Sequence, residues 1–242
     1  MELTIPTKLS EIPLYQMVEY NSLPEMSPSD KTMKALSIFL NVSEKELSKF
    51  PLQVINKALT HVQNILNETP EFHKQFTHKG VKYGFEPNLD EMPLGSFIDV
   101  ENYEKNPADM WKLLSVLYRP IVKEGQGHRY LIETYKGKVN EAFKDLPSDI
   151  AYGALVFFCN LGIDLLSYTL KSLKAAETQA PMNKDLVKNG DGLHLSISYV
   201  EAMLQSLTEL VNCPFTPLSF GVLTNRIWQI WKDKLLTKQE NE

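Results

Sequence analysis

Apolar side chains recur every three or four positions along much of the chain, which is the spacing of one face of an α-helix. The pattern is clearest in the segment Leu52 to Leu66, where one stripe consists of Ile55, Leu59, Val62 and Leu66. Comparable stripes predict helices over 10–20, 30–40, 109–118 and 198–211, and a last helix that contains Leu223, Ile227, Ile230 and Leu235. Ser43 and Glu46 have the spacing of a capping box, so a short helix should begin there.

A longer helix is predicted from Ser148 to about Lys174, after the capping sequence Leu146-Pro147-Ser148-Asp149. It is apolar almost all round until Leu166, so we expect it at the centre of the domain with its first five turns the most buried. Asn160 and Asp164 interrupt its apolar run. The run is therefore too short and too polar to span a membrane, and we expect no membrane association.

Residues 72–86 have a different character, with partial alternation of apolar and polar positions around Lys79-Gly80. This pattern predicts a small antiparallel β-hairpin, which Arg129 to Tyr135 could extend. Between residues 86 and 106 we expect an irregular surface segment with at most one helical turn at 94–97. The predicted fold class is therefore mainly α, an α-rich α+β protein with one small antiparallel β element.

Three parts of the chain follow from these elements. Residues 1–174 should form the main helical domain, and 175–193, which contain Pro181, Gly190 and Gly192, should form a linker or long loop. Residues 194–242 should form a C-terminal pair of helices packed on the main domain.

The composition of the 242-residue chain excludes some classes of protein. The net charge is −5 and the isoelectric point is near 5.6, which argues against a general nucleic-acid binder. Cys159 and Cys213 are the two cysteines, and they form no CxxC pair, so a secreted disulfide scaffold is not expected. The N-terminal residues lack a basic stretch followed by an apolar one, so we expect no signal peptide.

Candidate chemistry along the chain is sparse. His73 and His78 would lie near each other in the hairpin, but zinc-type spacing of a third ligand is missing, and a solvated hairpin is the simpler interpretation. The acidic run from Asp90 to Glu104 lacks the alternating ligands and turn glycine of a calcium loop. Gly125-Gln126-Gly127 does not match a phosphate-binding loop. We therefore predict a non-enzymatic protein with no catalytic, cofactor or metal site.

The last helix is the most distinctive feature. Trp228 and Trp231 alternate there with basic residues that include Arg226 and Lys232. These four residues are the candidate partner-binding site, since tryptophan and arginine anchor many interfaces. The equally good alternative is a helix docked on the protein's own core, with both indoles completing that core.

Three stretches of the chain resemble uncharacterised proteins of tailed bacteriophages. They are Leu3 to Gln16; the run Gly80-Val81-Lys82-Tyr83-Gly84-Phe85-Glu86-Pro87 with Gly95 to Asp99 and Leu117 to Ile121; and Leu146 to Ala151 leading into Phe157 to Gly162. Together they span most of the first 170 residues. Proteins of this group are similar to tail-assembly chaperones and other small virion-assembly factors.

The resemblance implies a structural or assembly role in the virion, as a tail-assembly chaperone or a connector component. It implies partners among other phage proteins of the tail or connector, a possible homo-oligomer, and a location in the cytoplasm of the infected bacterial host or in the virion. Two alternatives remain open: a small regulatory or host-takeover protein that binds a host factor, and an enzyme whose site is assembled from residues distant in sequence.

Overall fold

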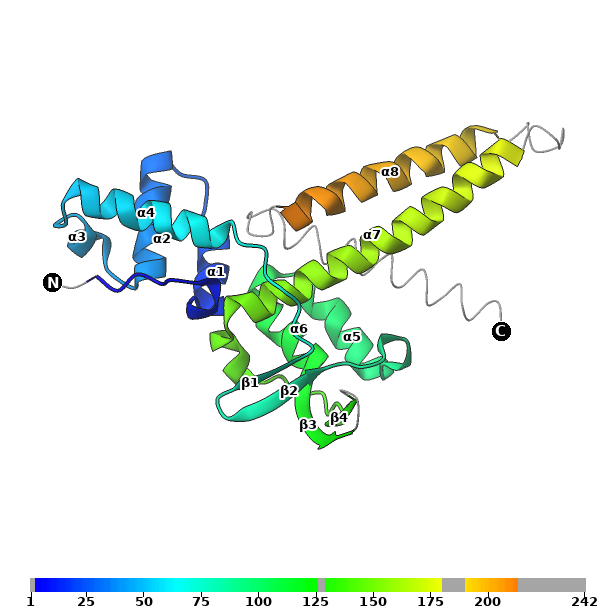
Figure 1. Ribbon diagram of the computed structural model, residues 1–242, viewed down its shortest axis with the longest axis horizontal. Helices are drawn as coiled ribbons and strands as arrows, with labels where there is room; N and C mark the ends of the chain where they lie inside the picture. The colour runs from blue at the N-terminus through cyan, green and yellow to red at the C-terminus, as the bar shows by residue number, and fades with distance from the viewer. Residues whose placement is uncertain (1–2, 126–128, 180–189, 213–242) are drawn as a thin grey trace.

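The computed structural model describes residues 3–125, 129–179 and 190–212. These residues form eight α-helices and one four-stranded antiparallel sheet, so the protein is mainly α with a small β element, as predicted. Figure 1 shows three regions side by side: an N-terminal group of helices, a central region that contains the sheet, and a long helical hairpin that projects away from both.

The N-terminal group begins with a 3-10 turn at Leu9–Glu11. Its helices are α1 (Leu14–Asn21), α2 (Pro28–Leu40), α3 (Glu44–Leu47) and α4 (Leu52–Leu66). α2 begins at Pro28 because the Ser27 side chain accepts a hydrogen bond from the Asp30 amide. The predicted capping box is present: the Ser43 hydroxyl caps the Glu46 amide and the Glu46 carboxylate binds the Ser43 amide.

The sheet confirms the predicted hairpin. A strand also forms within residues 129–135, but it joins the sheet through a strand at 118–124 that the sequence did not predict. The strands of the sheet are β1 (Gln75–His78), β2 (Val81–Phe85), β3 (Tyr118–Glu124) and β4 (Tyr130–Ile132), paired in that order. Lys79 and Gly80 both have positive φ, which a tight turn between β1 and β2 requires. The helix that precedes β3 ends at Leu117, close to the predicted limit at 118. The chain continues directly into β3, where Pro120 lies opposite Tyr83.

The segment between residues 86 and 106 corrects the prediction. Instead of at most one turn, it contains the ten-residue helix α5 (Leu94–Tyr103). Pro93 precedes the first turn, where its missing N–H costs nothing. Ser96 and Val100 are buried one turn apart, and Phe97 and Tyr103 pack half-buried against the core, so tertiary packing stabilises this helix. α6 (Met110–Leu117) follows, and a 3-10 turn covers Glu141–Asp145.

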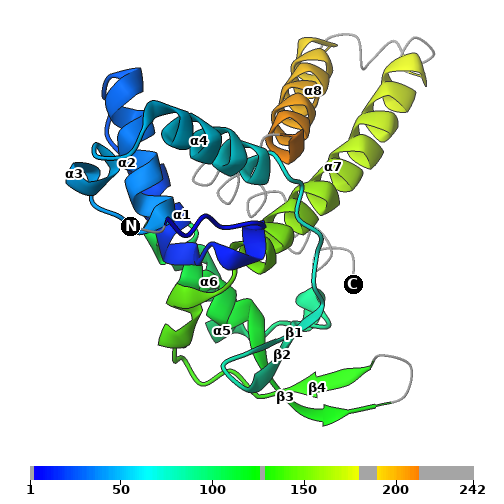
Figure 2. The same ribbon diagram turned by 60° about the vertical axis from the view of Figure 1, so that its left-hand side comes forward.

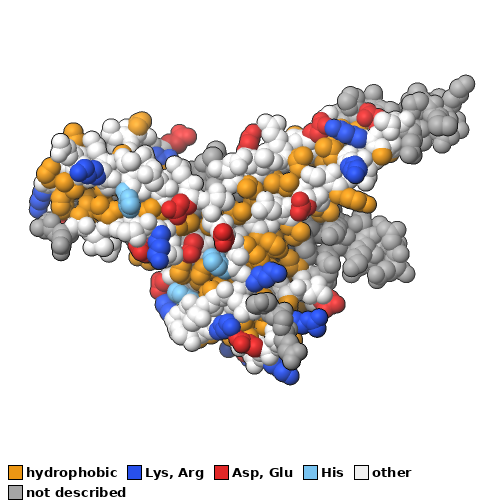
Figure 3. Space-filling view, viewed as in Figure 1, with side chains coloured by type: hydrophobic (Ala, Val, Ile, Leu, Met, Phe, Trp, Pro, Cys, Tyr) orange, Lys and Arg blue, Asp and Glu red, His pale blue; other side chains and the backbone are white. Residues whose placement is uncertain are grey.

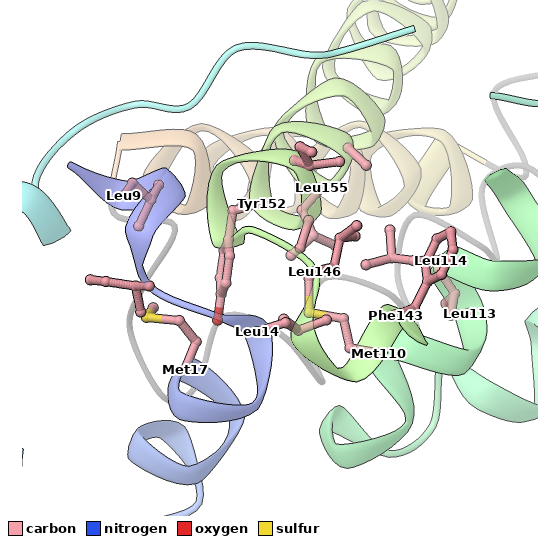
Figure 4. Close-up of a cluster of buried hydrophobic side chains, with 14 of the residues drawn as sticks. Leu9, Leu14, Met17, Met110, Leu113, Leu114, Phe143, Leu146, Tyr152 and Leu155 are labelled. Atoms are coloured by element: carbon pink, nitrogen blue, oxygen red, sulfur yellow. The ribbon is translucent and has the colours of Figure 1, made fainter. Parts of the chain in front are cut away.

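The helix predicted from Ser148 is α7 (Ser148–Gln179), and its first turns form the centre of the protein. Figure 4 shows Tyr152 and Leu155 of α7 among buried side chains from the first turns of the chain, from α6 and from the turn before α7. The backbone joins the same regions, since the Leu14 amide donates to the Leu146 carbonyl and the Ser148 amide donates to the Ile12 carbonyl.

α7 is also long and apolar enough to cross a membrane by length and composition alone. In its most apolar window, 61% is buried inside the protein, which is the behaviour of a core helix. The absence of membrane association stays a prediction.

α8 (Gly190–Asn212) completes the described structure. The linker predicted at 175–193 overlaps both helices, because α7 continues to Gln179 and α8 begins at Gly190, and residues 180–189 lie outside the described residues. Ala175, Ala176 and Glu177 are good helix formers, so nothing local ends α7 at Lys174. The glycines of the first turn of α8 lie at a helix end, where their cost is smaller than in a helix interior.

Candidate functional site

The second half of α7 and all of α8 form an antiparallel helical hairpin that projects from the body of the protein (Figures 1 and 2). Apolar residues recur at alternating intervals of three and four along both helices. They are Cys159, Ile163, Leu166, Leu170 and Leu173 on α7, and Ile197, Val200, Leu204, Leu207 and Val211 on α8. Nine of these ten side chains belong to one apolar cluster, which we call the seam. This heptad spacing is the pattern of an antiparallel coiled coil.

The seam divides the hairpin into two sides, and an ion pair identifies one of them. At about 100° per residue, Lys174 and Glu201 each lie to one flank of the seam on their own helix. Their side chains meet, with Lys174 Nζ 2.7 Å from Glu201 Oε1, so these two flanks face the same way. We call this the charged side.

All the charged residues in 158–174 and 196–212 lie on the charged side. They are Asp164, Lys171, Lys174, Glu201 and Glu209. Acidic and basic side chains are visible along the hairpin in Figure 3. Ion pairs and solvated charges of this kind are ordinary for an exposed helix face, so the charged side needs no partner.

The opposite side of the hairpin carries no charged residue in the same described ranges. It consists of Leu161, Leu165, Tyr168, Thr169 and Ser172 on α7, and Tyr199, Met203 and Ser206 on α8. We call it the uncharged side. Leu161, Leu165 and Tyr168 are spaced by four and three residues, which gives α7 a second heptad stripe beside the seam. On α8, Tyr199 is exposed, whereas Met203 is only 8% exposed and packs in the same apolar cluster as the seam.

Large side chains on the uncharged side reach solvent. Tyr168 is 72% exposed and Tyr199 is 66% exposed, which makes them two of the most exposed large apolar residues in the described structure. Leu161 and Leu165 are half-buried. A two-stranded coiled coil buries only its seam, so the second stripe of α7 together with the exposed Tyr199 of α8 indicates a further packing surface. Exposed tyrosines on an uncharged helical surface are typical of protein interfaces.

Cys159 lies at the end of the seam nearest the body of the protein, and its thiol is unreactive. Burial raises the pKa of its thiol to about 12. The thiolate is the nucleophilic form of cysteine, and at neutral pH almost none of it is present here. Cys159 therefore packs as a small apolar residue.

A second feature of the described residues is a polar cavity of about 420 Å³ between β3 and residues 133–141. Its wall includes Arg119, which forms a buried ion pair with Glu86. The Tyr135 hydroxyl donates to Asp99, and the Asn140 side-chain amide donates to the Tyr83 hydroxyl 2.8 Å away. These partners come from β2, β3 and α5, so the cavity wall ties the sheet to the adjacent helix.

Two tyrosines in the wall of this cavity, Tyr118 and Tyr135, hold their protons. Burial raises the pKa of Tyr118 and that of Tyr135 above the ordinary value, and the hydrogen bond to Asp99 raises the pKa of Tyr135 further. A tyrosine shifted in this direction is a weaker acid and supplies no base at neutral pH. The cavity therefore has the character of a structural hydrogen-bond network.

The two histidines of the hairpin do not form a metal site in the described structure. His78 Nε2 lies 2.9 Å from the Ala142 carbonyl, and the His73 carbonyl accepts a hydrogen bond from the Tyr118 hydroxyl. In the described residues, no three His, Cys, Asp or Glu side chains form a group that could hold a metal ion. From the acidic run, Asp99 is engaged by Tyr135.

The predicted partner-binding residues Trp228, Trp231, Arg226 and Lys232 lie outside the described residues. The uncharged side was not predicted from the sequence. The sequence does contain a second heptad stripe on α7, formed by Leu161, Leu165 and Tyr168. A helix that is apolar on both faces is, however, normally interpreted as a fully buried core helix.

Comparison with known proteins identifies no family for this chain. No protein-family model matches the chain, and neither a curated protein nor a solved structure is detectably similar to it.

Proposed function

We propose that this protein is a non-enzymatic assembly factor of a tailed bacteriophage, a tail-assembly chaperone or connector component that binds another protein through the uncharged side of its α7–α8 hairpin. The partner is a tail or connector protein that offers an apolar helix or an apolar helical face. The protein acts in the cytoplasm of the infected host or in the virion. The phage context rests on the sequence resemblance.

The observation that carries the proposal is the division of the hairpin into a charged and an uncharged side. Tyr199 stands exposed on the side that carries no charged residue, and Tyr168 stands exposed at the edge of that side, one helical turn from Asp164 and Lys171. Burying a charge without a partner is costly, whereas burying tyrosine rings is favourable. An amphipathic helix of a partner laid along this side would follow the helix-in-groove mode of recognition.

A matched set of variants tests the binding surface. Ser172→Glu and Tyr199→Glu place a carboxylate on the uncharged side, whereas Ser167→Glu and Ser198→Glu place it on the charged side. All four original residues are exposed, so none of the changes disturbs the core. Each full-length protein is used for affinity capture from phage-infected cells, followed by identification of the captured proteins by mass spectrometry.

The wild-type protein and the two charged-side variants should capture the same tail or connector protein. The two uncharged-side variants should lose at least about tenfold of it, since one interfacial anchor often contributes 2 kcal/mol or more. Capture of a host factor in place of a virion protein would contradict the assembly role and support the regulatory one. Equal capture by all five proteins would contradict the proposed surface.

A further inference from the structure

We infer that the polar cavity between β3 and residues 133–141 is a binding site for a small oxyanion, a molecule that carries a carboxylate or phosphate group. The cavity lies in the body of the protein, and no residue of the α7–α8 hairpin lines it. The inference therefore goes beyond the proposed function and is independent of it.

The first observation is an arginine in the cavity wall that is only partly paired. Arg119 lines the cavity and is 7% exposed. Glu86 engages its Nη2 atom, whereas its Nε atom is buried without a hydrogen-bond partner in the described structure. A buried donor that stays unpaired is costly, so a ligand oxygen that accepts from this guanidinium would bind favourably. Guanidinium groups match carboxylate and phosphate oxygens especially well.

The charges of the lining favour an anion. Three cationic side chains and two carboxylates line the cavity: Arg119, Lys136, Lys138, Glu133 and Glu141. This excess of positive charge occurs in a chain whose net charge is −5. Glu141 is paired with Lys144, which lies outside the lining, and Glu133 is paired with Lys136. Lys138 forms no ion pair within the part of the chain that the structure describes, so its ammonium group is available to a ligand.

Two further carboxylates belong to the hydrogen-bond network of the wall, but neither lines the cavity. Glu86 is held by Arg119, and Asp99 accepts a hydrogen bond from the Tyr135 hydroxyl. Both negative charges are therefore engaged by wall residues that stand between them and the cavity. An anion in the cavity would meet Arg119 and Lys138 rather than these carboxylates.

The size and polarity of the cavity indicate what kind of anion fits. Its volume is about 420 Å³. One water occupies only about 30 Å³, and sites for small molecules usually measure about 300–1,000 Å³. The Asn140 amide donates to the Tyr83 hydroxyl within the wall, so the network holds the wall in shape without filling the space. An apolar ligand would leave the polar lining unpaired, which is costly. A small hydrophilic anion satisfies both conditions.

NMR titration of the full-length protein tests the site directly. Inorganic phosphate and citrate are the probes, and sodium chloride at matched ionic strength is the control. At least one probe should give saturable chemical-shift changes at the amides of Tyr135, Lys138 and Asn140, whereas chloride should give none. Saturation by phosphate alone would assign a phosphate group to the ligand, and saturation by citrate alone would assign a carboxylate.

Two lysine variants form a matched pair for the same titration. Lys138→Gln and Lys123→Gln each remove one exposed positive charge, but Lys123 lies on β3 outside the lining. Lys138→Gln should weaken binding by about threefold, as the loss of an exposed ion pair does. Lys123→Gln should leave the affinity unchanged.

The role of the guanidinium needs a variant that still folds. Arg119→Met combined with Glu86→Leu removes the buried ion pair as a unit and leaves the net charge unchanged. The double variant should bind at least about tenfold more weakly, because charge-assisted hydrogen bonds are strong. Circular dichroism checks its fold, and the lysine pair decides the question if the double variant does not fold.

Three results would overturn the inference. If neither probe gave a saturable change beyond that of chloride, the cavity would hold water only. Equal weakening by Lys138→Gln and Lys123→Gln would show that the probes respond to overall charge. Unchanged binding by a folded Arg119→Met, Glu86→Leu protein would show that the guanidinium holds no ligand. All three are measured without a partner protein, so they leave the proposed hairpin surface untouched.

Discussion

Gly153 lies on α7 where the chain segment that leads into β1 crosses the helix. A Cβ atom at this position would lie 2.1 Å from the carbonyl oxygen of Glu71 and 2.9 Å from its carbonyl carbon, both backbone atoms. Neither can move aside as the end of a flexible side chain can. The next residue of the crossing segment, Phe72, stacks on Phe157 with ring centroids 4.2 Å apart and meets Phe85 edge to face. Gly153→Ala should therefore push this segment off α7 and loosen both ring contacts.

The magnitude follows from two opposing terms. Alanine in place of glycine favours a helix interior by about 1 kcal/mol. Overpacking against a rigid neighbour costs about 1–3 kcal/mol. Because the neighbour here is backbone at a very short distance, the cost of Gly153→Ala should lie at the upper end of that range. The net loss should be about 2 kcal/mol in the free energy of unfolding. For a chain of this size, that loss lowers Tm by about 4–8 °C.

Urea denaturation and thermal melting followed by circular dichroism measure this loss. Gly95→Ala is the matched control, because Gly95 also lies in a helix, α5, but nothing approaches its Cβ position within 4 Å. That change should leave stability unaltered or raise it by up to about 1 kcal/mol. If Gly153→Ala were as stable as the wild type, or more stable, the close crossing of residues 71 and 72 over α7 would be refuted.

Three further predictions concern other parts of the fold. Arg119→Met should destabilise the protein by about 3–5 kcal/mol in urea denaturation, because it leaves Glu86 buried without its partner, and Glu86→Leu in the same chain should restore much of the loss. In a Cys213→Ser background, Ellman's reagent at pH 8 should modify Cys159 only as fast as the protein opens, and modification within seconds would contradict its burial. Ser43→Ala should cost about 1 kcal/mol of stability, and NMR titration should show the pKa of Glu46, which hydrogen bonds from Ser43 lower, rising toward its ordinary value.

Much of the fold was predictable because local signals and tertiary packing agree. α4 carries its apolar stripe on one face and has the predicted limits. Lys79 and Gly80, which both have positive φ, form the turn of the predicted hairpin. α5 was missed because its sequence is rich in acidic and turn-forming residues. The contacts of Phe97, Val100 and Tyr103 with the core stabilise it instead. Tertiary contacts outweighed local propensity there.

The candidate site was predictable only in part for a different reason. The apolar residues of α7 were recognised, but a sequence does not say which of them face another helix and which face solvent. The pairing of α7 with α8 makes that distinction, since it uses Ile163 and Leu170 for the seam and leaves Leu161 and Tyr168 outside it. Knowledge of the ion pair between Lys174 and Glu201 is what identifies the uncharged side.

Site-specific photo-crosslinking in phage-infected cells tests the proposed binding surface most directly. A photoreactive phenylalanine analogue is placed in the full-length protein at Tyr168 or Tyr199 on the uncharged side, or at Ser167 or Ser198 beside them. The account predicts that irradiation joins the Tyr168 and Tyr199 positions to one tail or connector protein, and that the Ser167 and Ser198 positions give little of that product. Crosslinks of equal yield from all four positions, or crosslinks from the serine positions alone, would contradict it.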